Sequence, residues 1–199
     1  MLEYLLQIDK EALLFLNGLH NSFFDVLMYL MTHLWFWLPF LAVLLWFMWK
    51  HYRKRLALLF VFFALSVTLS DQISVLIKKK VQRPRPSHNI EIQDKLHLHE
   101  YKNGGVYRGG KYGFVSSHAA NSFGLMVLFL YFFRPINKRL LWVFPAWAAL
   151  FSYTRIYLGV HYPSDILCGA LVGIGCGLLV LGGYRGVFAG KIKCKKRYS

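Results

Sequence analysis

Residues 56–77 read LALLFVFFALSVTLSDQISVLI, a block of 22 residues in which Asp71 is the one charged side chain. A helix of about 20 apolar residues is long enough to cross the hydrocarbon core of a bilayer. Four further apolar blocks accompany this one, so the candidate spans are residues 24–49, 56–77, 116–133, 140–154 and 164–183. The sequence therefore predicts an all-α fold, a polytopic transmembrane helical bundle with about five spanning helices.

The composition favours the same class. Of the 199 residues 56% are hydrophobic, and the mean hydropathy is positive, which is unusual for a soluble domain of this size. The net charge of +15 would by itself also fit a nucleic-acid-binding protein. Most basic residues flank apolar blocks, as they do in membrane proteins, and no nucleic-acid-binding module is recognisable. We therefore expect membrane lipids, and no nucleic acid, as partners.

The amino-terminal segment differs from the apolar blocks. Residues 1–22 mix Leu and Phe with the charged residues Glu3, Asp9, Lys10 and Glu11. This pattern is typical of an amphipathic helix that lies at the membrane interface. We expect a single membrane domain over residues 1–199 that begins with this interfacial helix.

Three small residues recur in the last apolar block. Gly169, Gly173 and Gly177 are four residues apart, so they lie on one face of a helix. Small residues at this spacing let two membrane helices approach closely. We expect them to serve packing within the monomer rather than a dimer interface.

Charges in the connectors predict the orientation. The connectors after the first, third and fifth blocks are rich in Lys and Arg. They contain Lys50, Arg53, Lys54 and Arg55; Arg134, Lys138 and Arg139; and, in the tail of residues 185–199, Lys191, Lys193, Lys195, Lys196 and Arg197. The positive-inside rule puts these connectors in the cytoplasm. The amino terminus and the loop of residues 78–115 then face outward.

One basic cluster breaks this rule. It lies at the outward end of the second block and consists of Lys78, Lys79, Lys80, Arg83 and Arg85. Positive charge placed against the topological bias needs another reason, and holding an anion such as phosphate is one. The alternative is a charge run that faces solvent or lipid headgroups.

A second outward stretch leads into the third block. Residues 112–121 read YGFVSSHAAN, and Ser116 is a good helix N-cap. A helix that starts there directs its free N–H groups and its positive dipole end outward, which favours binding of an anion. His118 would then lie in the first turn, beside that anion. Alternatively, the serines only cap the helix and His118 only marks the interface.

A third stretch opens the fifth block. It contains Arg155, His161 and Asp165, with Pro163 at the first helical position. At this spacing the carboxylate can bond to one imidazole nitrogen and leave the other free to attack, as in nucleophilic catalysis. A purely structural salt bridge between Arg155 and Asp165 is the alternative.

Together these stretches resemble the type 2 phosphatidic acid phosphatase family. Its pattern is Lys-x6-Arg-Pro, then Pro-Ser-Gly-His, then Ser-Arg-x5-His-x3-Asp, and the chain matches all three in order over residues 78–165. The chain departs from the pattern at Val115, Ser117 and Thr154, none of which replaces a charged residue or a histidine. The same motif set also resembles vanadate-dependent haloperoxidases, but those proteins are soluble.

The resemblance implies a role for each matched residue. His161 would be the nucleophile, Asp165 would orient it, and His118 would protonate the leaving group. The phosphate would be bound by Lys78, Arg85, Arg155, Ser116 and Ser117. The implied reaction is hydrolysis of a lipid phosphate monoester or diphosphate through a phospho-histidine, with no metal and no cofactor. For a bacterial host this implies an inner-membrane protein whose site faces the periplasm or exterior. The alternative is a non-catalytic lipid-phosphate binder or a flippase-like protein.

The loop between the first two motifs permits two further interpretations. His97 and His99 could bind zinc, although exposed loops often collect such residues without a metal. The later part of the loop is rich in Gly and Tyr. It could act as a lid or recognise a headgroup, or it could be a plain surface loop.

Overall fold

The fold is a bundle of α-helices. The computed structural model describes residues 1–101 and 103–188, so the predicted basic tail lies outside them from residue 189 onward. The elements of the described ranges are α1 (Leu2–Gly18), α2 (Ser22–Leu30), η1 (Leu34–Trp37), α3 (Leu38–Tyr52), η2 (Arg53–Arg55), α4 (Leu56–Val81), η3 (Pro86–His88), η4 (Gln93–Lys95), α5 (Ser117–Phe133), α6 (Leu140–Tyr157) and α7 (Pro163–Phe188). Strand-like pairing in these ranges is limited to two isolated bridges, Pro84–Tyr112 and Glu100–Val106. The all-α prediction is confirmed.

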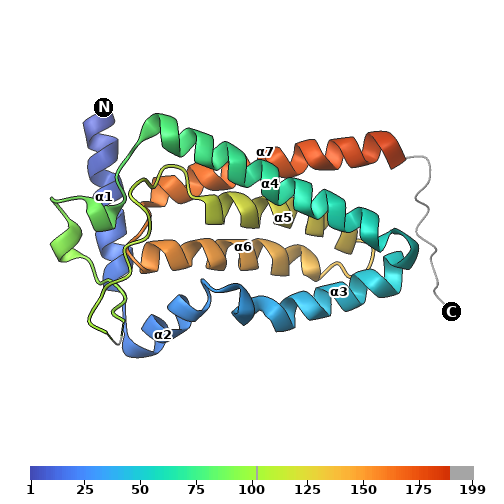
Figure 1. Ribbon diagram of the computed structural model, residues 1–199, viewed down its shortest axis with the longest axis horizontal. Coiled ribbons are helices and arrows are strands. Elements are labelled where there is room, and N and C mark those ends of the chain that lie inside the picture. Colours follow the sequence, from blue (N-terminus) through green and yellow to red (C-terminus); the bar gives the residue numbers. More distant parts are fainter. Residues whose placement is uncertain (102, 189–199) are drawn as a thin grey trace.

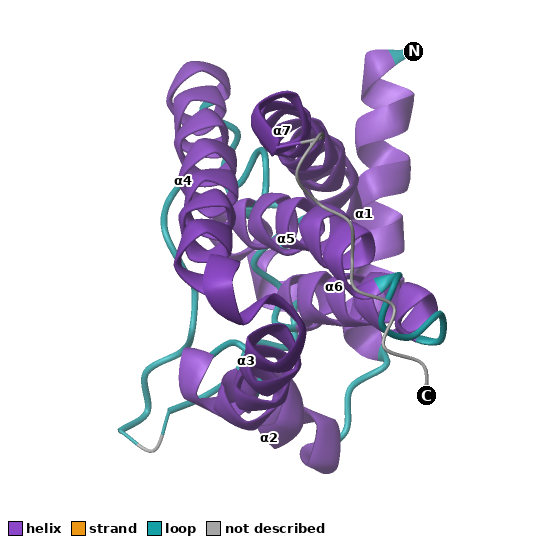
Figure 2. Cartoon of the chain, turned by 90° about the vertical axis from the view of Figure 1, so that its right-hand side faces the viewer, coloured by secondary structure: helices purple, strands orange, loops and turns teal. Residues whose placement is uncertain are grey.

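Helices α3 to α7 run along the long axis of the molecule, and α5 packs against α4, α6 and α7 (Figures 1 and 2). Buried aromatic rings fill the space between them, and Phe129 stacks on Phe144 with ring centroids 5.0 Å apart. Helix α1 crosses one end of this bundle, and the loop between α4 and α5 lies at the same end (Figure 1). That end therefore collects the segments that carry the three motifs.

Two helical stretches of the described chain are long and apolar enough to cross a membrane, Leu34–Val81 and Pro163–Phe188. Helix α5 is also apolar but is shorter, with 17 residues. Helix α6 starts at the predicted residue 140 and extends to Tyr157, three residues beyond the predicted block. The prediction of a transmembrane helical bundle is confirmed.

The first predicted span is wrong as a continuous helix. Instead of one helix over residues 24–49, the chain forms α2, a turn, η1 and α3. His33 is extended, with φ −93° and ψ 138°, and Pro39 follows in the first turn of α3. Proline has no N–H group to donate to the preceding turn, so it favours a helix start here. Periodic hydrophobicity alone does not reveal this break.

Helix α1 has one buried face, as an amphipathic helix should. Asp9, Leu13 and Asn17 are four residues apart and are all buried, while Tyr4, Ile8 and Phe15 on the other side are exposed. The buried face packs against α6 and α7. The carboxylate of Asp9 and the side-chain amide of Asn17 are thus buried in the protein, where each needs a polar partner.

The glycines that recur every four residues in α7 lie at its contact with α5. A Cβ atom added to Gly173 would lie 2.1 Å from the carbonyl oxygen of Ala120, and one added to Gly177 would lie 2.7 Å from that of Gly124. The two backbones can meet only because these positions lack side chains. The predicted role in packing within the monomer is confirmed, and this contact brings the start of α7 beside the start of α5.

The first prediction concerns this contact. Replacing Gly173 with Ala forces α5 and α7 apart, so we expect the free energy of unfolding to fall by about 1–3 kcal/mol, the usual cost of overpacking. Thermal unfolding of the detergent-solubilised protein measures this change. Gly175→Ala is the matched control, because nothing lies within 4 Å of its added Cβ. Equal stability of the two variants would contradict the prediction.

Candidate active site

The three motifs converge at one end of the bundle. Lys78 lies in the last turn of α4, and its Nζ donates to Ser117 Oγ at 2.5 Å. The backbone N–H of Ser116 donates to the carbonyl oxygen of Asp165 at 2.9 Å, which ties the start of α5 to the start of α7. Arg155 lies in the last turn of α6, close to the same point. Segments more than 80 residues apart in the chain therefore form one site.

His161 and Asp165 form a buried pair. The imidazole Nδ1 and the carboxylate Oδ2 are 3.2 Å apart, and the side chains are 1% and 0% exposed. Oδ2 also accepts the backbone N–H of Tyr162 at 3.1 Å, which holds the carboxylate in place. An Nδ1–H that donates to this carboxylate leaves the lone pair on Nε2. Nε2 is thus the nitrogen that can attack.

The surroundings keep His161 neutral. Burial lowers the pKa of its imidazole well below the ordinary value, and the positive charges of Arg85, Arg155 and Lys78 lower it further. His161 itself lies between α6 and α7, outside both helices. At neutral pH the ring is therefore unprotonated, which is the state that a nucleophile requires.

The guanidinium groups of Arg85 and Arg155 have donors without partners. Arg155 is 2% exposed, and within the described chain its Nε and Nη1 find no hydrogen-bond acceptor. Nη1 of Arg85 is also buried and has no hydrogen-bond acceptor within the described chain. The Nε of Arg85 donates to the Tyr112 carbonyl oxygen at 3.2 Å. Burial, followed by the charge of Arg155, lowers the pKa of Arg85 to about 10. Buried unpaired charge is costly, and an anion with several oxygens would satisfy all three donors at once.

The alternative of a structural bridge between Arg155 and Asp165 is wrong. Asp165 pairs with His161 and with Arg83, whose Nη1 lies 3.1 Å from Oδ1. Arg155 instead donates from Nη2 to the hydroxyl oxygen of Tyr107 at 2.6 Å. Its remaining donors are thus left for a ligand.

Ser116 caps α5 as predicted. Its side chain accepts the backbone N–H of Ala119 at 3.5 Å, and α5 begins at Ser117. The hydroxyl of Ser117 is also 2.6 Å from that of Ser74. His118 follows in the first turn, half-buried, with its ring 5.5 Å from that of Phe151. It lies within electrostatic range of His161 and of the three predicted cations.

Sequence reasoning missed the role of Arg83. Its guanidinium donates to Asp165 Oδ1 at 3.1 Å, to Ser164 Oγ at 2.7 Å and to Asp9 Oδ2 at 2.7 Å. It also lies over the ring of Tyr162, 3.9 Å from the centroid. Arg83 was recognised only as part of a basic cluster, because nothing in its spacing distinguishes it from its neighbours.

Asp9 is the second residue that was missed. It accepts the Ser164 backbone N–H at 2.9 Å and the Ser164 hydroxyl at 2.5 Å, in addition to its ion pair with Arg83. Its carboxylate thus fixes α1 on the first turn of α7. The signal in the sequence is an acid in line with Leu13 and Asn17 on one helical face.

The loop between α4 and α5 lies directly on the site. A Cβ atom added to Gly109 would be 2.7 Å from Arg85 Nη1, and one added to Gly113 would be 2.9 Å from Asp165 Oδ2. The ring of Tyr107 lies 5.5 Å from the guanidinium carbon of Arg155. Larger side chains at the two glycines would enter the space around the cations.

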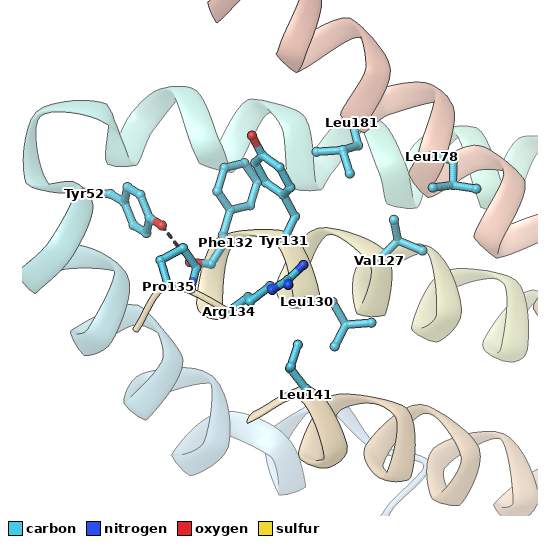
Figure 3. Close-up of a pocket in the computed structure, with 10 residues that line it drawn as sticks. All are labelled: Tyr52, Val127, Leu130, Tyr131, Phe132, Arg134, Pro135, Leu141, Leu178 and Leu181. Atoms are coloured by element: carbon cyan, nitrogen blue, oxygen red, sulfur yellow. Dashed lines mark hydrogen bonds between the residues drawn. The ribbon is translucent and has the colours of Figure 1, made fainter. Parts of the chain in front are cut away.

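A separate cavity of about 620 Å³ opens at the opposite end of the bundle (Figure 3). Its lining is mostly apolar and includes Tyr52, Leu130, Leu178 and Leu181, with the side chain of Arg134 among them. It contains neither histidine nor carboxylate among its lining residues. The histidines, the carboxylate and the unpaired arginine donors described above therefore lie at the α1 end and not in this cavity.

The chain is similar to known proteins over most of its length. The PAP2 superfamily matches residues 59–187. The lipid A 4'-phosphatase of Bacteroides thetaiotaomicron is 41% identical over 177 residues, which cover 87% of this chain and 75% of the relative. The lipid A 4'-phosphatase of Porphyromonas gingivalis is 35% identical over 175 residues, which cover 87% of this chain and 71% of that protein.

Two solved structures share the fold. The crystal structure of Aquifex aeolicus LpxE has a TM-score of 0.66 and 23% identity, and the match covers 86% of this chain and 93% of the other. A transmembrane PAP2-type phosphatidylglycerolphosphate phosphatase from Bacillus subtilis has a TM-score of 0.67 and 19% identity, with 97% and 90% coverage. At these sequence identities, both matches show that the fold is shared and nothing about function.

The second prediction concerns the unpaired donors. Inorganic phosphate should bind between Arg85 and Arg155 and raise the thermal unfolding temperature, by mass action corresponding to about 2.7 kcal/mol at a hundredfold excess over Kd. Arg155→Ala should remove most of this shift. Arg134→Ala is the control, since Arg134 is exposed at the opposite end of the bundle. A phosphate shift that survives in Arg155→Ala would rule out this anion site.

Proposed function

The chain belongs to the PAP2 superfamily and is a membrane-embedded lipid phosphatase, and on that premise we propose that it hydrolyses a lipid phosphate monoester through a phospho-histidine intermediate. The single observation that carries the proposal is the set of unpaired buried donors on Arg85 and Arg155 beside the His161–Asp165 pair. Membership in a family of enzymes argues against the non-catalytic alternative. The transmembrane bundle likewise argues against the soluble haloperoxidases.

Phosphate binding is the first step. Arg85 and Arg155 donate to the phosphoryl oxygens, and Lys78 adds a third positive charge from α4. Ser117 links Lys78 to the amino-terminal end of α5, where Ser116 caps the helix and the first turn has backbone N–H groups without helical partners. Fixed cations in a water-poor site stabilise the charge that develops on the transferring phosphoryl group.

Attack by His161 is the second step. Nε2 forms a bond to phosphorus while the bond from phosphorus to the ester oxygen breaks. Asp165 holds Nδ1–H and stabilises the positive charge that develops on the imidazole. His118 donates its proton to the departing oxygen, because an alkoxide is a poor leaving group. The negative charge of the bound phosphate offsets the nearby cations and favours the protonated form of His118 in the complex.

Water completes the reaction. His118, now neutral, removes a proton from a water molecule that attacks the phospho-histidine. The N–P bond breaks, inorganic phosphate is formed, and His161 returns to its neutral state. No metal ion takes part, since the three cations supply the positive charge that a metal would otherwise provide.

The proposed substrate is a phosphate ester on the headgroup of lipid A. Its support is the similarity to two lipid A 4'-phosphatases over most of both chains. We propose that the loop carrying Tyr107, which contacts Arg155, also contacts the headgroup. Because Tyr107 occupies one donor of Arg155, we propose that it withdraws when the phosphate binds.

The proposed location is the bacterial inner membrane, with the site facing the periplasm. Its support is the distribution of basic connectors. Arg53–Arg55 and the connector of residues 134–139 lie at the end of the bundle opposite the motifs (Figure 1). With the basic end in the cytoplasm, the site lies on the outer side.

The third prediction tests the reaction. Purified protein in the presence of EDTA should release phosphate from lipid A in preference to phosphatidic acid, phosphatidylglycerol phosphate and undecaprenyl diphosphate. His161→Ala should lose about 10⁴-fold or more of this activity, as loss of a nucleophile usually costs. Substrate labelled with ³²P should leave base-stable label on the wild-type protein and none on His161→Ala. Activity that disappears with EDTA, or full activity in His161→Ala, would exclude the mechanism.

The fourth prediction concerns Arg83 as a positioning residue. Positive charge nearby lowers the pKa of His161, so Arg83→Gln should raise that pKa. The acidic limb of the kcat/KM profile should then move to higher pH, because the imidazole stays protonated longer as pH rises. We expect kcat to fall about 10–100-fold, as for other orienting partners. Arg108→Gln, which changes an arginine of the same loop bound to Gln93 and Ser87, is the control. A fall in activity with an unmoved pH profile would indicate a structural role only.

A further inference from the structure

Three potential metal ligands meet away from the active site. His20 lies between α1 and α2, Asp25 lies in the first turn of α2, and His97 lies in the loop between α4 and α5. One donor atom from each lies within 4.8 Å of the others. The ligands come from distant parts of the chain, so tertiary folding and not local sequence brings them together.

Their spacing fits a transition-metal ion. His97 Nε2 and Asp25 Oδ1 are 3.0 Å apart, and the rings of His20 and His97 are parallel with centroids 3.6 Å apart. Two donors that bind zinc at about 2.1 Å in tetrahedral geometry lie about 3.4 Å apart. The His97–Asp25 pair therefore already has nearly the required separation. The parallel rings of His20 and His97 must turn out of their stack before both lone pairs can point to one ion, and the exposed His20 has room to do so.

The ligands are held by a second layer of hydrogen bonds. The Tyr157 hydroxyl donates to Asp25 Oδ1 at 2.7 Å. Asn17 is buried, and its Oδ1 accepts the His97 backbone N–H at 2.8 Å while its Nδ2 donates to the carbonyl oxygens of His97 and Tyr157. Such outer partners orient ligands and are a regular feature of metal sites.

The local charge also favours a cation. Asp25 and His97 line a cavity of about 530 Å³ together with Asp94, His99, Glu100 and one basic residue, Arg108. Three of the nine acidic residues of the chain thus surround this cavity, although the chain as a whole carries a net charge of +15. His20 is exposed, which leaves room for water as a fourth ligand.

We propose that His20, Asp25 and His97 bind one divalent transition-metal ion, with zinc as the ion that best suits two imidazoles and a carboxylate. The pairing differs from the zinc hypothesis based on His97 and His99, since His99 stacks on Tyr29 with ring centroids 3.9 Å apart. The ion would fasten the loop of residues 82–116 to the junction of α1 and α2. It would be structural and would take no part in the phosphoryl transfer.

The test measures metal content. The full chain, purified in detergent and stripped with a chelator, is incubated with zinc, passed over a gel-filtration column and analysed for zinc per chain. We expect one zinc per chain in the wild type and at least a tenfold weaker affinity in His20→Ala. This variant removes an exposed ring, so its fold should persist. Asp25→Asn should lose zinc as well, while His51→Ala, in the last turn of α3, should retain it.

Thermal unfolding provides a second readout. Zinc should raise the unfolding temperature of the wild type and of His51→Ala, and not that of His20→Ala; magnesium and calcium, which prefer oxygen ligands, should have little effect. Phosphatase activity with EDTA present reports separately on the proposed reaction. Absence of bound zinc in the wild type, or equal retention by His20→Ala and His51→Ala, would overturn the proposal.

Discussion

The carboxylate of Asp165 is the point on which the site depends. It is completely buried, and its two oxygens serve different partners: Oδ2 accepts from His161 and from the Tyr162 backbone, and Oδ1 accepts from Arg83. A buried carboxylate is tolerated only when it is paired in this way. The same group therefore selects the tautomer of His161 and connects the start of α7 to the loop and, through Arg83, to α1.

The cations of the site, unlike the carboxylate, are held in an unfavourable arrangement. Lys78, Arg85 and Arg155 approach one another at the ends of three segments, and part of their donor capacity is unused in the described chain. Close packing of α5 on α7 and the cap at Ser116 fix the scaffold against their mutual repulsion. Such strain is common at functional sites, because a ligand that relieves it binds strongly.

Much of the fold and of the site could be predicted from sequence. Apolar blocks reveal helices directly, and the three motifs contain charged residues whose spacing has few structural explanations. The break at His33 could not be predicted, since apolar residues continue on both sides of it. The network of Asp9 and Arg83 was also missed, because an ion pair between residues 74 positions apart leaves no local pattern. Long-range pairing becomes visible only when the helices are placed in space.

The ion pair of Asp9 has a consequence for the beginning of the chain. Helix α1 reaches His161, the proposed nucleophile, through three successive partners, Asp9, Arg83 and Asp165. Without the carboxylate of Asp9, Arg83 would have only Asp165 as an ion-pair partner. Arg83 would then draw the Asp165 carboxylate away from the imidazole of His161. A fusion partner that displaces the first helix, or a deletion that removes it, would thus act on chemistry carried out more than 150 positions downstream. The amino-terminal helix is thus part of the support of the proposed active site.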